Sequence, residues 1–170
     1  MRSAILLICV AAAVSVASGA NGIQPRPSAS DYPAHQNVAN VTVAAALLSP
    51  EQTKERFNED LNVIGYMVVE VAVYPDPDHK VNVSPHDFVL HLTPGSAIAQ
   101  AVTPNGLPAD LEANLTHQAL PEVATAEPVA GYLYFPKLPM HRSKKGPAAT
   151  VDLTWNAQGG PIQVTLMSSR

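Results

Sequence analysis

Five basic side chains gather in a short stretch near the carboxyl-terminal end of the sequence: Lys137, His141, Arg142, Lys144 and Lys145. Prolines and a glycine flank them and favour a long loop, which would display the cations together at one end of a domain. Such a surface binds anions through charge, for example a phospholipid head group, lipopolysaccharide or an acidic protein. The alternative interpretation is a solvated loop that only keeps the surface polar.

Other reactive residue types are present but lack the spacing that their chemistry requires. The six histidines form no HExxH or HxH pair. Asp76, Asp78 and His79 share one turn, but two prolines stiffen it and no glycine lets the chain wrap around calcium. No GxSxG or SxxK motif occurs. We therefore expect no catalytic residue, no metal site and no cofactor, and we expect that the protein is not an enzyme.

The first twenty residues have the three parts of a secretory signal peptide. Arg2 supplies the positive start, Ala4 through Ala17 carry no charge, and Ser18-Gly19-Ala20 supplies small residues for cleavage before Asn21. The apolar run is shorter than the about 20 residues of a spanning helix, so a cleaved signal is favoured over an uncleaved anchor. The sequence thus predicts an exported protein, periplasmic or secreted, with no transmembrane segment after cleavage.

Cleavage would change the composition of the chain. The single cysteine, Cys9, leaves with the signal, which excludes disulfides and thiolate chemistry. Arg2 leaves too, so nine basic residues remain against fourteen acidic ones. This acidity argues against a nucleic-acid partner. The remaining length suits one domain with its own core.

The mature chain divides into a tether and a β-rich domain. Residues 21–38 combine prolines with polar residues and show no apolar period, which predicts a flexible tether. From residue 39 to 170, apolar residues alternate with a period of two. Strands are predicted at 41–47, 65–74, 87–92, 129–135, 150–155 and 162–166, with a short return at 81–83. Trp155 is predicted to lie in the core beside Val151 and Leu153.

Helices are few in this pattern. Ser49, Pro50 and Gln52 form a capping box that predicts a short helix over 50–58. Within 93–127 the prediction is weaker, with an edge strand at 97–102 and a helix at 108–118. About seven short strands, one short helix and no βαβ rhythm predict an antiparallel β-sandwich of the immunoglobulin-like type.

Four tyrosines lie opposite the predicted core face of their strands: Tyr66, Tyr74, Tyr132 and Tyr134. An exposed stripe of tyrosines would be a binding surface. The alternative is that the early helix or the region 93–127 covers this face.

Three strand segments resemble a known group of domains. They are Gly65–Val73, Val83–Leu90 and Pro128–Pro136. They are similar to bacterial exported immunoglobulin-like domains of unknown function, which are fold relatives of the mycobacterial immunoprotective extracellular antigen. The resemblance covers roughly residues 40–168 and implies the fold, but no activity. We therefore expect an exported, non-enzymatic interaction module of the cell envelope or secreted fraction. The alternative is a periplasmic protein that handles a small ligand or metal.

Overall fold

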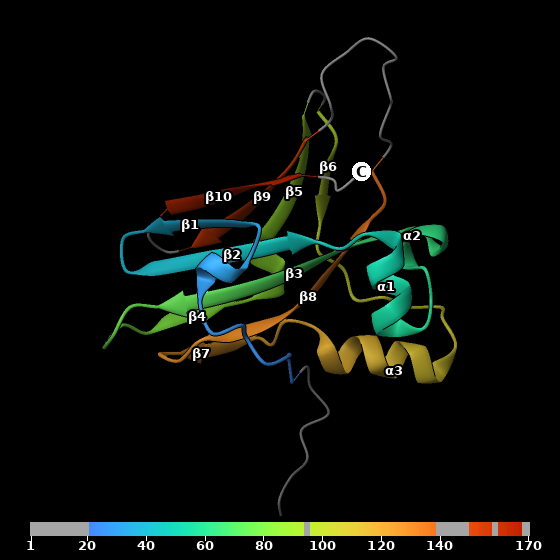
Figure 1. The fold of residues 1–170 in the computed structure, drawn as a ribbon, viewed down its shortest axis with the longest axis horizontal. Coiled ribbons are helices and arrows are strands. Elements are labelled where there is room, and N and C mark those ends of the chain that lie inside the picture. The colour runs from blue at the N-terminus through green and yellow to red at the C-terminus, as the bar shows by residue number, and fades with distance from the viewer. Residues whose placement is uncertain (1–20, 94–95, 139–149, 158–159, 168–170) are drawn as a thin grey trace, which may run out of the picture.

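The computed structural model describes residues 21–93, 96–138, 150–157 and 160–167, which form two antiparallel sheets packed face to face (Figure 1). The first sheet has the order β1-β2-β3-β8, with β1 (Ala34–Val38), β2 (Val41–Leu47), β3 (Tyr66–Pro75) and β8 (Val129–Pro136). The second has the order β10-β9-β5-β6, with β10 (Gly160–Met167), β9 (Thr150–Ala157), β5 (Phe88–Thr93) and β6 (Ile98–Gln100). A separate ribbon pairs β4 (Val81–Val83) with β7 (Val123–Thr125). The predicted all-β sandwich is confirmed.

Alternating apolar side chains fill the space between the two sheets, as the period of two predicts. From the first sheet they include Val43, Met67, Val69, Val71, Val73, Leu133 and Phe135, and from the second Phe88, Leu90, Leu92, Val151, Leu153, Trp155, Ile162, Val164 and Leu166. Trp155 is 1 % exposed and stacks on Phe88, with ring centroids 5.6 Å apart and planes 6° from parallel. The prediction that Trp155 is a core residue is therefore confirmed.

Three helices cover part of the outer face of the first sheet, where the sequence predicted one with a second as a weaker expectation (Figure 1). α1 (Pro50–Phe57) begins with the predicted capping box: Gln52 N donates to Ser49 Oγ, and Ser49 N donates to Gln52 Oε1. α2 (Leu61–Ile64) follows directly, and α3 (Ala109–Gln118) agrees with the weaker prediction at 108–118. Because these helices pack on the sheet, they bury its outer side chains.

The tyrosine face is one of the surfaces that these helices cover. Tyr132 and Tyr134 are each 2 % exposed and form a second apolar cluster with Phe57, Leu61 and Leu115. The Phe57 and Tyr132 rings meet edge to face at 5.1 Å. The exposed tyrosine stripe is therefore not formed, and the alternative, a covered face, is the arrangement found.

Residues 21–38 differ from the flexible tether that the sequence predicted. They hold a 3-10 turn, Ala29–Asp31, and then β1, which pairs with β2 across the turn at Ala39 and Asn40. Ala39 has a positive φ of 53° at this turn. The part before β1 is held by residues far along the chain, Glu70 and Ala130, which a pattern of local periodicity does not reveal.

The outer edge of β8 is covered by three short segments rather than by another strand. The carbonyls of Ala130, Tyr132 and Tyr134 accept hydrogen bonds from the backbone N–H groups of Ile23, Leu120 and Val102, at 2.9, 3.0 and 2.8 Å. The chain at Leu120 passes so close that a Cβ on Gly131 would lie 2.3 Å from Leu120 N and Cα. Only glycine fits at that position.

Candidate functional site

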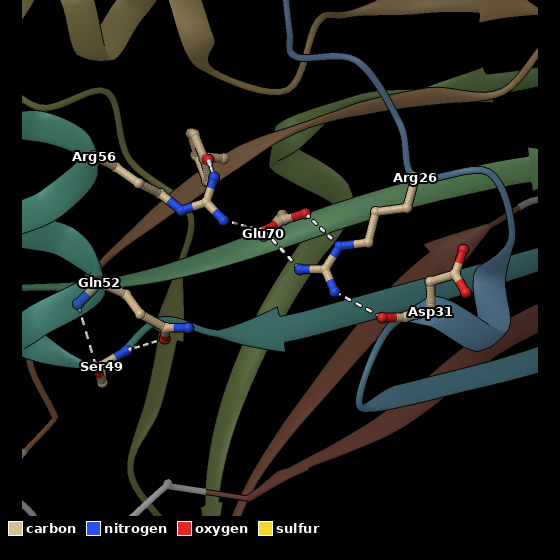
Figure 2. Close-up of polar contacts among 7 residues, drawn as sticks. Arg26, Asp31, Ser49, Gln52, Arg56 and Glu70 are labelled. Carbon is tan, nitrogen blue, oxygen red and sulfur yellow. Dashed lines mark hydrogen bonds and ion pairs between the residues drawn. The ribbon is translucent and has the colours of Figure 1, made fainter.

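A buried carboxylate on the outer face of the first sheet collects the strongest polar contacts among the described residues. Glu70 lies in the middle of β3 and is 3 % exposed (Figure 2). Arg26 forms a two-point contact with it: Nε donates to Oε1 and Nη2 to Oε2, each at 3.1 Å. Arg56 of α1 approaches from the other side, with Nη2 3.5 Å from Oε2. We call Arg26, Arg56, Glu70 and Tyr132 the Glu70 cluster.

The remaining groups of the Glu70 cluster are also bonded. Arg26 Nη1 donates to the Asp31 carbonyl at 2.7 Å, and its guanidinium lies 4.2 Å from the centre of the Tyr32 ring. Arg56 Nη1 donates to the Tyr132 hydroxyl at 2.6 Å. Forked arginine–carboxylate contacts of this kind are strong and directional. The Glu70 cluster therefore joins the amino-terminal segment, α1 and the sheet.

The surroundings of the Glu70 cluster shift the pKa values of Arg26 and of two tyrosine hydroxyls. The hydrogen bond to Glu70 raises the pKa of Arg26, although burial opposes it. Burial raises the pKa of the Tyr132 hydroxyl, partly offset by the charge of Arg56. Burial, reinforced by the charge of Glu70, also raises the pKa of Tyr32. These pKa directions favour a charged Arg26 and neutral phenols, and we interpret the cluster as a structural joint between the amino-terminal segment, α1 and the sheet.

The sequence held one signal for the Glu70 cluster. Glu70 is a charged residue in a strand with apolar residues on both faces, and a buried carboxylate needs a partner. Its main partner, Arg26, lies 44 residues away in the segment predicted to be a tether. Sequence reasoning therefore missed the Glu70 cluster.

Of the five basic residues proposed as a partner-binding surface, only Lys137 lies within the described residues. It follows β8, and its Nζ donates to the Asn62 carbonyl at 3.1 Å. His141, Arg142, Lys144 and Lys145 lie outside the described residues. The anionic-partner hypothesis for these residues therefore stays a prediction.

The aspartate-rich turn after β3 is held by local hydrogen bonds. His79 N donates to the Asp76 carbonyl at 3.1 Å, and His79 Nδ1 lies 3.0 Å from the Pro77 carbonyl. Within residues 21–93, 96–138, 150–157 and 160–167, no three His, Cys, Asp or Glu side chains are grouped so that they could hold a metal ion.

A hollow of about 160 Å³ opens at the end of the sandwich away from α1 and α3. We call it the terminal hollow. Its apolar lining includes Val38, Val41, Val81, Trp155 and Ile162, and its polar lining is His79, Lys80, Asn40 and Asn82. Lys80 carries the one formal charge among the described lining residues, and Asp76 lies next to the lining, its backbone N donating to the Asn40 carbonyl at 2.8 Å. No sequence motif predicts the terminal hollow, because its residues come from three separate parts of the chain, 38–41, 79–82 and 155–162.

One of the residues that line the terminal hollow, Trp155, carries an unsatisfied donor. Trp155 Nε1 is shielded from solvent and has no hydrogen-bond partner among the described residues. A buried donor left unpaired costs roughly 1–3 kcal/mol. Tyr32 Oη and Asn62 Nδ2 are also buried and unpaired in the described chain, but neither residue lines this hollow.

A second hollow, of about 370 Å³, lies beside the covered edge of β8. Its polar lining includes His86, Thr103, Thr116 and Glu122, and we call it the side hollow. His86 and Glu122 are exposed to solvent, and the buried hydroxyl of Tyr134 is already bonded to the Leu115 carbonyl at 3.0 Å. None of the described residues that line the side hollow has a buried donor without a hydrogen-bond partner. In this respect the side hollow differs from the terminal hollow, which Trp155 lines.

Comparisons with known proteins give one structural similarity. No family model matches the chain, and no curated protein matches it. The crystal structure of a putative lipoprotein (ycdA) from Bacillus subtilis is similar over 77 % of this chain, with a TM-score of 0.43 and 15 % sequence identity. The chain spans 37 % of that protein's length. The resemblance to immunoglobulin-like exported domains therefore stays a prediction.

A search for membrane-spanning helices was negative in the described part of the chain. None of the helices there is both long and apolar enough to cross a bilayer.

Proposed function

We propose that this chain is an exported, non-enzymatic binding domain that holds a small organic anion in the terminal hollow. The observation that carries the proposal is the buried, unpaired N–H of Trp155 at a hollow without a carboxylate. An indole nitrogen only donates, so its missing partner is an acceptor. Export is supported by the signal pattern of residues 1–20.

The size and the charge of the terminal hollow limit the range of ligands that it could bind. A dry apolar cavity of about 150 Å³ accommodates benzene, so a hollow of about 160 Å³ accommodates a ligand with an apolar body of that size. Valine and isoleucine side chains supply apolar walls for such a body. Lys80 and the Trp155 N–H favour a carboxylate over a neutral or cationic head group, because hydrogen bonds to charged groups are the stronger ones.

The proposal is tested with three probes of one size: benzoate, benzamide and benzylammonium. We expect benzoate to bind about ten-fold more tightly than benzylammonium, measured by calorimetry, which corresponds to the roughly 1.5 kcal/mol of a charge-assisted hydrogen bond. Trp155→Phe keeps an aromatic ring but removes the N–H, and should weaken benzoate binding about ten-fold. Lys54→Gln, on an exposed position of α1, is the control. Equal binding of the three probes, or none, would contradict the proposal.

A second measurement needs no assumption about the ligand. Native mass spectrometry of protein purified from its own host without chelator should show a small organic acid bound to the chain. A bound metal ion instead would favour the metal-handling alternative. A bare chain that also ignores all three probes would favour the macromolecular interaction module.

A further inference from the structure

The amino-terminal segment is fastened to the outer face of the first sheet at successive points. We call residues 21–33 the strap. Ile23 N donates to the Ala130 carbonyl at 2.9 Å, and Arg26 binds Glu70 (Figure 2). The Tyr74 hydroxyl donates to the Arg26 carbonyl at 2.8 Å, and Tyr32 is 3 % exposed. The strap is therefore part of the folded domain along its length.

Gly22 lets the strap begin so close to the sheet. Its φ is +73°, and a Cβ at this residue would lie 2.3 Å from the Ala130 carbonyl oxygen. Both the conformation and the space require glycine. The first residues of the strap are therefore placed by backbone contacts, and Asn21 has a defined position.

Asn21 meets the carboxyl end of α3. Its backbone N donates to the His117 carbonyl at 2.9 Å, and its Nδ2 lies 3.2 Å from His117 Nδ1. The last carbonyls of a helix carry a partial negative charge, which favours a cation there. On α3 the acidic side chains, Asp110 and Glu112, lie in the first turn, and the titratable imidazole of His117 lies in the last turn. The His117 carbonyl is thus the acceptor that faces the Asn21 nitrogen.

The signal pattern predicts cleavage of the Ala20–Asn21 bond, and this bond involves the same nitrogen atom. Hydrolysis adds one water across the bond: Ala20 leaves as a carboxylate, and Asn21 N becomes an amino group that takes up a proton. We infer that the carboxyl end of α3 is a built site for this new α-ammonium group, and that its charge strengthens the hold that α3 already has on Asn21 at the start of the strap. Cleavage replaces a neutral donor by a charged one without moving it.

The first test compares two forms of the cleaved chain that differ in this charge and in one acetyl group, whose carbonyl takes the place of the Ala20 carbonyl. The described contacts all lie within residues 21–167, so the product of cleavage retains them. At pH 6 the free α-amino group is protonated, since its pKa is about 7.7–8.0. We expect the α-acetylated chain to melt about 1–4 °C below the free chain, the range for one charge at a helix end in a domain of this size. Equal melting temperatures would overturn the inference.

The second test uses two arginines that share one carboxylate. Arg26→Gln releases the strap from Glu70, whereas Arg56→Gln removes a contact to the same Glu70 from α1. The decrease in melting temperature caused by acetylation should shrink to less than half in the Arg26→Gln chain. In the Arg56→Gln chain the decrease should persist. The Asn21→Ala chain keeps the amino group, so acetylation should lower its melting temperature as it does in the wild type. An undiminished shift in Arg26→Gln would show that the amino group acts elsewhere, which contradicts the inference.

The third test addresses the order of cleavage and closure. The strap begins at the residue after the scissile bond, and proteases bind substrates as extended chains. Signal peptidase should therefore cut the folded Arg26→Gln precursor at least about ten-fold faster than the folded wild-type or Arg56→Gln precursor. Amino-terminal sequencing of the products should give Asn21. Equal cleavage rates, or a different first residue, would contradict a strap that already holds Asn21 against α3 in the precursor. None of these readouts depends on a ligand in the terminal hollow.

Discussion

The Glu70 cluster and the terminal hollow are both buried polar regions of one sandwich, and they differ in how their hydrogen bonds are satisfied. Glu70 is almost fully buried, yet both of its oxygens receive guanidinium donors. Trp155 is buried as deeply, yet its N–H has no partner among the described residues. A satisfied group of this kind stabilises a fold, whereas an unsatisfied one is a candidate for a ligand. The difference separates the structural joint from the proposed binding site.

Trp155→Ala should have the largest effect on stability. The side chain fills the space between the sheets and stacks on Phe88, so its removal leaves a cavity. We expect a loss of about 3–5 kcal/mol in the free energy of unfolding, measured by denaturant titration. A loss below about 1 kcal/mol would mean that the sheets close over the gap.

Glu70→Gln tests the other region. The change leaves two guanidinium groups facing an amide. Removing one member of a fully buried ion pair costs about 3–5 kcal/mol, and we expect about 2–3 kcal/mol here because both arginines keep some contact with solvent. Glu55→Gln, on an exposed position of α1, should change stability by less than about 0.5 kcal/mol. If both variants matched the wild type, the Glu70 cluster would not be a joint.

Trp155→Phe sharpens the contrast between burial and hydrogen bonding at one residue. It removes an unpaired buried donor, which stabilises the fold, and a little side-chain volume, which destabilises it. These two contributions to the free energy of unfolding should offset each other. We expect the free energy of unfolding to stay within about 1.5 kcal/mol of the wild type. Chemical denaturation followed by circular dichroism measures this, because the change removes the single tryptophan. A loss as large as that of Trp155→Ala would indicate that the N–H is bonded after all.

The basic residues beyond Lys137 should have the smallest effect on the fold. Changing Arg142, Lys144 and Lys145 together to Ser should alter stability by less than about 0.5 kcal/mol. If these residues bind an anionic surface, the wild type should bind anionic vesicles at low salt and lose that binding as salt rises. Lys54→Ser provides the charge control. Equal vesicle binding by wild type and triple variant at every salt concentration would leave these residues as ordinary surface.

The fold was predictable where the pattern was local. The alternation of Met67, Val69, Val71 and Val73 is enough to place β3 and its core face, and the capping box is enough to place α1. The strap was not predictable in this way, because its order depends on Glu70 and Ala130, far along the chain. The terminal hollow was missed for the same reason. Trp155 was correctly predicted as core, but its missing hydrogen-bond partner is a property of three-dimensional packing alone.

The covered edge of β8 has a consequence for the behaviour of the protein at high concentration. An open edge strand is a template on which another copy can add a strand, and this is how many β-proteins aggregate. Here the carbonyls of Ala130, Tyr132 and Tyr134 are already occupied, the first of them by the strap. A chain whose strap is loosened would expose the Ala130 end of this edge. The Arg26→Gln variant should therefore form intermolecular β-structure at concentrations where the wild type stays dispersed, a difference that light scattering and amyloid-dye binding would detect.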